Sequence, residues 1–254
     1  LPDPHGPDAV RPPYDNMYKH MNFQKPPTFN LDPAIVPSWA KPEKNPKLTH
    51  HQYFGMVKCI DDNVGKIISY LREANLLDKT IIVFTSDHGD LRAEHGKHNK
   101  GNPLEASAKI PFIVYYPVKI PASTVVKNAF NTVDFAPTFL TLMDQKVPVQ
   151  MQGRDFSSLL INPGSQIDFE DITFMRSTGL GTEGNWIAAV TSQYKLILSK
   201  NDEPWLIDME TDPDELINFA KEPDKADIVK ELANQLNGYA QKHNDSFLQG
   251  TKMG

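Results

Sequence analysis

The spacing of apolar residues predicts one long helix in the first third of the chain. Between His50 and Ala74, apolar residues recur at intervals of three and four positions: Tyr53, Met56, Val57, Ile60, Val64, Ile67, Ile68 and Leu71. This spacing produces an apolar stripe along one face of an α-helix. Cys59 lies inside the predicted helix, so we interpret it as a small packing residue rather than a nucleophile.

Two short apolar runs follow the predicted helix. Residues 81–84 form an unbroken run rich in β-branched side chains, which is typical of a strand covered on both faces in the middle of a parallel sheet. Residues 110–116 form a second run and predict the next strand. Together with the helix, these strands predict half of a parallel sheet of the βαβ type.

The pattern changes after about residue 166. The segments ITFMRST, NWIAAVTSQYKLILS and PWLIDMETDPDELINFA predict three or four antiparallel strands joined by turns. Residues 225–243 then predict an amphipathic helix. We therefore expect an α/β fold with two units: a larger α/β domain over residues 1–163, and an α+β subdomain with an antiparallel sheet and a terminal helix over residues 164–254.

The remaining segments predict less regular structure. Residues 1–49 are rich in proline, which fixes φ and removes backbone donors, and predict a segment that wraps the surface without regular structure. Residues 131–143 predict a short helix. In the segment that follows, Arg154 could reach an anion, but we interpret it as part of a surface ion pair.

Composition excludes several classes of function. The 254 residues are 39% hydrophobic and 23% charged, with a net charge of −6 and scattered basic residues, so we expect no nucleic acid partner. No apolar run approaches the length of a membrane span, so we expect no membrane contact. The single cysteine excludes an internal disulfide. The chain begins at Leu1, which indicates a fragment or a processed chain and leaves the cellular compartment open.

Candidate chemistry follows the first predicted strand. Asp87, His88 and Gly89 come directly after residues 81–84, at the end of a strand where α/β folds bind ligands. Adjacent residues of an extended chain point to opposite faces, so both side chains bind one ion only if the chain turns, which Gly89 would allow. An Asp oxygen with an imidazole nitrogen suits a divalent ion, and the lysines that follow suit an anion. Alternatively, Asp87 caps a helix.

The residues around this site resemble a known family. The segment SDHGDLRAEHGKHNKGNPLEASAKIPFIVYYP resembles the second metal-binding motif of the sulfatase family, within the alkaline phosphatase-like superfamily. The resemblance implies that Asp87 and His88 ligate Ca²⁺ or Mg²⁺, that Lys100 binds the sulfate, and that Glu105 matches the acidic position before the next strand. Lys97 and His98 lie so close to Lys100 in sequence that the register of this match stays open.

Two further segments resemble the same family. Pro4-His5-Gly6-Pro7 resembles its Pro-His-x-Pro pattern, which implies that His5 is the general acid for the leaving-group oxygen. A histidine titrates near neutral pH and suits this role. The Tyr-Lys-Leu-Ile strand and the Asp-Pro-x-Glu-x-x-Asn turn near the end of the chain resemble the sulfatase C-terminal subdomain. The resemblance implies the C-terminal part of an alkaline phosphatase-like α/β sandwich.

Several family features do not occur in this chain. Sulfatases attack sulfur with a formylglycine made from a Cys/Ser-x-Pro-x-Arg motif, and no such motif is present. The formylglycine and two aspartate ligands are therefore expected in an N-terminal half outside these residues. Asp87 and His88 alone are too few for a cation that takes six or more ligands. The resemblance implies the incomplete C-terminal portion of a sulfuric ester hydrolase that acts on sulfated small molecules or carbohydrates. We expect this portion to be inactive by itself.

Two alternatives remain open at this point. A phosphonate or phosphate ester hydrolase of the same superfamily shares the Asp-His-Gly strand end. A sulfatase-like module without catalytic activity could instead bind anions. If the chain is only part of the enzyme, its sheet is cut and one edge strand is exposed. We expect the chain to associate with itself into a homo-oligomer through that edge. A periplasmic or extracellular location is compatible with a bacterial-type sulfatase.

Overall fold

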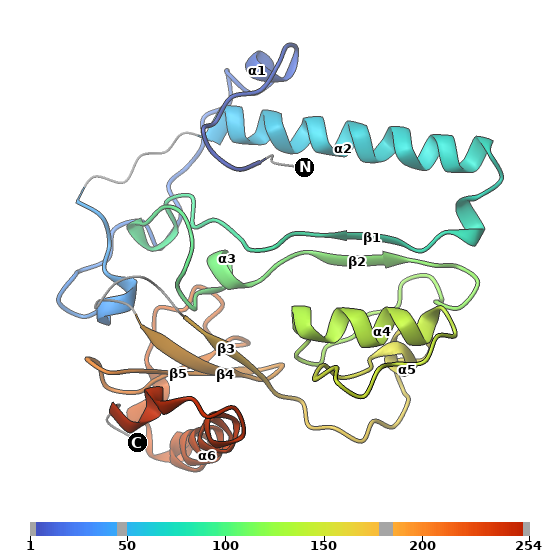
Figure 1. The fold of residues 1–254 in the computed structure, drawn as a ribbon. Helices are drawn as coiled ribbons and strands as arrows, with labels where there is room; N and C mark the ends of the chain where they lie inside the picture. Colours follow the sequence, from blue (N-terminus) through green and yellow to red (C-terminus); the bar gives the residue numbers. More distant parts are fainter. Residues whose placement is uncertain (1–3, 45–49, 178–184, 251–254) are drawn as a thin grey trace.

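The computed structural model describes residues 4–44, 50–177 and 185–250 as a mixed α/β molecule (Figure 1). The α-helices are α1 (Tyr14–Met17), α2 (His50–Glu73), α3 (Glu105–Ala108), α4 (Phe135–Leu142), α5 (Ser157–Ile161) and α6 (Ala226–Lys242). The strands are β1 (Ile82–Thr85), β2 (Phe112–Tyr115), β3 (Thr173–Arg176), β4 (Trp186–Val190), β5 (Tyr194–Ser199) and β6 (Trp205–Asp208). Short 3₁₀ turns occupy Ser38–Ala40, Leu77–Lys79, Glu94–Gly96, Thr132–Asp134, Phe219–Lys221, Pro223–Lys225 and Ser246–Gly250.

Helix α2 confirms the long helix that the periodicity predicts. Its N-terminal half packs against α1, where Gly55 is required because a Cβ there would lie 2.4 Å from the Tyr14 carbonyl oxygen. Met56 and Cys59 are buried on this side, so Cys59 is the packing residue expected. The stripe is only partly covered, however, because Ile67 remains 57% exposed in the C-terminal half of the helix.

The expected parallel pairing of the first two strands is wrong. β1 and β2 pair antiparallel, with Phe84 opposite Ile113, and form a two-stranded sheet. β1 is also not covered on both faces, since Phe84 is 39% exposed, and Ile113, its partner on β2, is 63% exposed. No other strand of the described residues pairs with β1. The apolar composition of the run is that of a buried strand, but within the described chain nothing covers this face.

The C-terminal strands and helix are confirmed. β3, β4, β5 and β6 form one antiparallel sheet in sequence order. Helix α6 packs its apolar face on this sheet (Figure 1), and Leu232 and Leu236 are buried together with Leu196 and Leu206 of the strands. Alternation along each strand places the apolar side chains of this core on one face of the sheet.

The other face of this sheet contributes to a second core. Trp186 and Ile197 of the sheet are buried against Trp39, Leu91 and Leu104 from the first part of the chain. This core therefore contains residues from both of the predicted units. The boundary between residues 163 and 164 stays a prediction.

A buried ion pair organises the segment around α4. The Arg154 guanidinium donates to Asp134 at 2.8 Å, and the Asp134 side chain is only 1% exposed. Arg154 also donates to the carbonyl oxygens of Ala129 and Ile172, so it joins three segments. The predicted ion pair is present, but its acid is buried rather than on the surface.

Among the described residues, the helices are too short or too polar to cross a membrane.

Candidate active site

Asp87 and His88 lie together directly after β1. The Asp87 carboxylate accepts the backbone N–H of His88 at 3.0 Å, and its second oxygen lies 3.4 Å from His88 Nε2. Asp87 therefore caps its own neighbour and no helix begins there. His88 Nδ1 lies 2.7 Å from the carbonyl oxygen of Gly89, and because a carbonyl only accepts, Nδ1 carries the hydrogen. In a neutral ring Nε2 then presents its lone pair toward the carboxylate, an arrangement that a shared cation would satisfy.

The sequence suggests that Gly89 is needed for a turn, but the structure shows that it is needed for close packing. Its φ is not in the left-handed region; instead, a Cβ there would lie 2.2 Å from the carbonyl oxygen of Ala106. The Gly89 N–H donates to the carbonyl oxygen of Ser107 at 2.8 Å. Glycine is therefore required by the close approach of two backbone segments, which holds the Asp87–His88 loop against α3.

The structure brings His5 and Lys100 together across 95 positions of sequence. The Lys100 ammonium lies 2.9 Å from His5 Nε2. An ammonium only donates, so Nε2 accepts and the ring hydrogen sits on Nδ1, 2.7 Å from the Gly6 carbonyl oxygen. Both side chains are exposed to solvent. The pair thus presents a cation and a titratable ring side by side on an open surface.

The electrostatic field of Lys100 and His88 reaches Asp87. Burial of Asp87 raises its pKa, but hydrogen bonds from the backbone N–H groups of Asp87 and His88, and the charges of His88 and Lys100, outweigh this effect. The net result is a pKa below the ordinary value of 3.8. Asp87 is therefore an ionised carboxylate at neutral pH, and Lys100 is close enough to contribute to it.

Lys97 and His98 have other neighbours than Lys100 has. The Lys97 ammonium donates to the carbonyl oxygen of Lys41 at 2.8 Å, and burial lowers its pKa. His98 Nδ1 lies 3.1 Å from the Glu43 carboxylate. Both side chains contact the N-terminal segment, whereas Lys100 contacts His5. Of these three side chains, Lys100 is the one that lies beside the predicted general acid.

Glu105 is partly buried, and its carboxylate is paired with a buried lysine. Its carboxylate accepts from the Lys195 ammonium at 2.6 Å, and Lys195 also donates to Glu215 at 2.8 Å. Burial raises the pKa of Glu105, but the charge of Lys195 holds it below the ordinary value. Burial raises the pKa of Glu215, and there the charge of Lys195 only partly offsets the effect.

Sequence reasoning missed Lys195 and Arg92. A lysine inside the apolar strand segment YKLIL is the signal that could have identified Lys195, because a buried cation needs partners. Arg92 forms a bidentate ion pair with Asp8 at 3.1 and 2.6 Å and lies 4.1 Å from the centre of the Tyr53 ring. The pair fixes the His5-Gly6-Pro7 segment near the site loop, and the sequence gives no sign of it.

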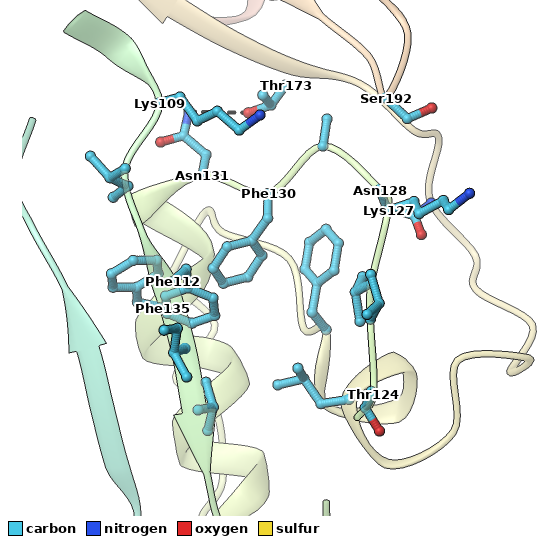
Figure 2. Close-up of a pocket in the computed structure, with 18 of the residues that line it drawn as sticks. Lys109, Phe112, Thr124, Lys127, Asn128, Phe130, Asn131, Phe135, Thr173 and Ser192 are labelled. Carbon is cyan, nitrogen blue, oxygen red and sulfur yellow. Dashed lines mark hydrogen bonds between the residues drawn. The ribbon is translucent and has the colours of Figure 1, made fainter. Parts of the chain in front are cut away.

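A groove of about 1140 Å³ begins beside Asp87 and continues between β2 and residues 121–132. Phe112, Phe130 and Phe135 form an aromatic wall, as Figure 2 shows. The ring centroids of Phe112 and Phe135 are 4.6 Å apart. On the side of this wall where Lys109 lies, the lining is polar, and the Asn131 amide donates to the Thr173 hydroxyl at 3.0 Å (Figure 2).

The donor set of this site fits a divalent cation only in part. Asp87 supplies a carboxylate, an ordinary ligand of Ca²⁺ and Mg²⁺, whereas the His88 imidazole nitrogen is more typical of transition-metal sites. Within residues 4–44, 50–177 and 185–250, no cluster of three or more His, Cys, Asp or Glu side chains could hold a metal ion. Two ligands leave most of a Ca²⁺ or Mg²⁺ coordination shell to other groups.

Two family models match the chain and overlap over residues 93–145. The model described as "Sulfatase" matches residues 2–145, and the model described as "N-sulphoglucosamine sulphohydrolase, C-terminal" matches residues 93–242. The chain is also 32% identical over 200 residues to an N-acetylglucosamine-6-O-sulfatase of Bacteroides thetaiotaomicron. That match covers 76% of this chain and 36% of the relative, so the chain spans about a third of the relative's length.

Solved structures show the same fold. A structure determined in complex with its substrate D-glucosamine-2-N,6-O-disulfate superimposes with a TM-score of 0.71 at 32% identity, covering 77% of this chain and 41% of that one. A phosphonate monoester hydrolase of Agrobacterium radiobacter superimposes with a TM-score of 0.72 at 20% identity, covering 97% and 56%. At this identity the second likeness concerns the fold alone. The fold agrees with the α/β class expected from the sequence.

Proposed function

Because the chain belongs to the sulfatase family, we propose that it forms the anion-binding part of a sulfuric ester hydrolase. The observation that carries this proposal is the contact of 2.9 Å between the Lys100 ammonium and His5 Nε2. A cation beside a titratable ring is suited to hold a sulfate group and to protonate the oxygen that leaves from it.

Each residue has a separate role in this proposal. Lys100 binds a sulfuryl oxygen and stabilises the charge that develops there. When the bound sulfate accepts the Lys100 hydrogens, His5 Nε2 no longer accepts from Lys100 and can carry a proton. As the bond between sulfur and the ester oxygen breaks, His5 Nε2 gives this proton to the departing oxygen, which leaves as an alcohol. The attacking group forms the new bond to sulfur and must come from another segment, because the chain has no Cys/Ser-x-Pro-x-Arg motif.

A divalent cation, Ca²⁺ or Mg²⁺, is the cofactor that we propose for the complete site. Asp87 Oδ2 and His88 Nε2 would supply two of its ligands, and the 3.4 Å between them brings a carboxylate and a lone pair to one place. When bound, such an ion withdraws charge from sulfuryl oxygens. The other ligands would belong to residues outside this chain. A formylglycine nucleophile is likewise proposed for the residues outside it.

The substrate class that we propose is a sulfated carbohydrate. The support comes from a relative that is named an N-acetylglucosamine-6-O-sulfatase and from a similar structure that was solved with D-glucosamine-2-N,6-O-disulfate. Both match this chain at 32% identity. A phosphonate or phosphate ester hydrolase remains the second candidate, because enzymes of that kind share the Asp-His-Gly strand end found at residues 87–89. Paired aryl sulfate and aryl phosphonate esters, given to the full-length protein, distinguish the two.

We also propose that the open face of β1 and β2 mediates association with a second copy of the chain. Ile82 and Phe84 lie opposite Tyr115 and Ile113 in the antiparallel pairing. Directly opposed side chains share one face of a sheet, so these four residues form one apolar surface. Exposed apolar strands of this kind favour association.

Calorimetry with Ca²⁺ and with inorganic sulfate tests the proposed function. In the full-length protein, which would supply the remaining ligands, we expect binding of both at millimolar concentration or tighter, loss of Ca²⁺ binding in Asp87→Ala, and loss of sulfate binding in Lys100→Ala. Asp90→Ala is the matched control for the first variant, because the Asp90 carboxylate accepts the backbone N–H of Arg92 and is not a proposed ligand. Sulfate binding that survives in Lys100→Ala would contradict the assignment of the anion site, and a module that binds sulfate but lacks turnover in the full-length protein would favour the non-catalytic alternative.

A further inference from the structure

One buried lysine connects the C-terminal sheet to the loop that carries Lys100. The Lys195 side chain projects from β5 and is 0% exposed. Its ammonium donates to the carbonyl oxygen of Pro103 at 2.8 Å, to Glu105 Oε1 at 2.6 Å and to Glu215 Oε1 at 2.8 Å. An ammonium has three hydrogens, and each of them has an acceptor here. Lys195 therefore makes every hydrogen bond that its chemistry allows.

Glu215 completes the attachment from the other side. Its second oxygen, Oε2, accepts the backbone N–H of Glu105 at 2.7 Å. Lys195 thus binds the Pro103 carbonyl oxygen and the Glu105 carboxylate, and Glu215 binds the Glu105 backbone amide. Together these contacts hold residues 103–105 against the C-terminal region. Glu215 itself has a φ of +54°, an unfavourable backbone conformation for a non-glycine residue that persists only where surrounding contacts impose it.

The segment that is held in this way contacts both parts of the candidate site. The Ser107 hydroxyl accepts the N–H of Gly101 at 3.0 Å, and Gly101 directly follows Lys100. The Ser107 carbonyl oxygen accepts the N–H of Gly89 at 2.8 Å, and Gly89 directly follows His88. Ser107 in turn donates to the carbonyl oxygen of Leu104 at 2.9 Å. A displacement of residues 103–105 would therefore move Lys100 and the Asp87–His88 loop together.

We propose that Lys195 is a positioning residue for the sulfate-binding site. With Glu215 it fixes residues 103–107, and through them it sets the distance of Lys100 from His5 and from the Asp87–His88 loop. The ligand in this inference, a sulfate group, rests on the proposed function. Stability alone does not account for the arrangement, because apolar residues of similar size commonly replace buried ion pairs without loss of stability. Apolar residues cannot hold a carbonyl and an amide at fixed points.

The test uses a neutral triple variant of the chain, Lys195→Met, Glu105→Gln and Glu215→Gln. It removes all three buried charges together, so no unpaired charge is left inside, and the amide oxygen at position 215 can still accept the Glu105 N–H. The control is Lys119→Met, which deletes another lysine ammonium that donates to a carbonyl oxygen and a carboxylate, those of Leu142 and Asp144. The readouts are the ¹⁵N shifts of the His5 ring, which report its hydrogen bond to Lys100, and the affinity for inorganic sulfate.

We expect the triple variant to fold, to change the His5 ring shifts toward those of a free histidine, and to bind sulfate at least tenfold more weakly. The control should retain the wild-type shifts and affinity. A folded triple variant with wild-type His5 shifts overturns the inference. Wild-type protein that does not bind sulfate overturns the proposed function instead, while the His5 shifts still decide the role of Lys195.

A second variant covers the case in which the triple variant does not fold. Glu215→Gln removes one charge and leaves Lys195 and Glu105 as a neutral pair. It should change the His5 shifts in the same direction but by less, and unchanged shifts would overturn the inference.

In the wild-type chain the amides of Gly89, Gly101 and Glu105 should exchange with solvent at one common rate. Independent exchange of Gly101 would also overturn it, whatever the variants do.

Discussion

The Lys100 ammonium lies 2.9 Å from His5 Nε2, and no regular element of secondary structure contains either residue. The two loops that carry them are held by contacts elsewhere: an ion pair between Asp8 and Arg92 on one side, and the Ser107 hydrogen bond to Gly101 on the other. The pair is therefore a property of tertiary packing. An anion that binds Lys100 would replace His5 as its acceptor, which couples anion binding to the state of the ring.

Replacement of Lys100 should remove most of the affinity for sulfate. We expect Lys100→Met to weaken sulfate binding by about 10- to 100-fold, because a hydrogen bond to a charged group contributes roughly 1.5–3 kcal/mol. Lys97→Met is the matched control, since the Lys97 ammonium contacts the carbonyl oxygen of Lys41 instead of the site. Calorimetric titration with sodium sulfate measures both. Equal losses in the two variants would mean that general positive charge, and not the position of Lys100, binds the anion.

Removal of Arg154 should destabilise the fold strongly. Arg154→Met leaves the Asp134 carboxylate, which is 1% exposed, without its cation, and a buried pair broken in this way costs about 3–5 kcal/mol. Urea unfolding followed by circular dichroism measures the change. The double variant Arg154→Met with Asp134→Asn should recover part of the lost stability, because no buried charge remains. A double variant that is less stable than Arg154→Met would contradict this explanation.

A charge on the open strand face should prevent self-association. Ile113→Lys places an ammonium in the centre of the apolar surface opposite Phe84, and because Ile113 is 63% exposed, the fold should tolerate it. Sedimentation velocity should show a self-associating wild-type chain and a monomeric variant. Val149→Lys is the control, since Val149 is 89% exposed and outside this face. A wild-type chain that stays monomeric at high concentration would show that this face does not pair with a second copy.

The regular elements were largely predictable because their signals are local. The periodicity of residues 50–74 predicts α2, and the alternating segments after residue 166 predict β3 to β6. The direction of β2 relative to β1 was not predictable, because an apolar run has the same composition in a parallel and an antiparallel pair. The expected burial of β1 was wrong for a related reason: composition records what a strand packs against, including groups outside the described residues.

In the candidate site, too, some residues have a local sequence signal, whereas the contacts between distant residues do not. Asp87 and His88 follow a strand, so their position could be read from a few adjacent residues. The contact between His5 and Lys100 came from the family resemblance, since no local pattern joins residues so far apart. Lys195 left a signal, a cation within an apolar strand, but its partners Pro103, Glu105 and Glu215 are 92, 90 and 20 positions away. Only the folded chain identifies which acceptors a buried donor finds.

His95 should make the fold less stable as the solution becomes mildly acidic. The side chain is 4% exposed, and burial, assisted by the charge of Lys195, lowers its pKa from 6.5 to about 4. Below pH 6.5 the unfolded chain takes up a proton at His95 that the folded chain does not, so the free energy of unfolding falls as the pH falls from about 6.5 to about 4. The difference between these values corresponds to roughly 3 kcal/mol at the acid end. Urea unfolding at pH 4, 5, 6 and 7 measures this slope.

His95→Gln should lower stability at neutral pH and flatten the slope, whereas His20→Gln, at an exposed position, should leave the slope unchanged. A slope that is the same in His95→Gln and in the wild type would place the acid sensitivity at other groups and contradict the buried, neutral state of His95.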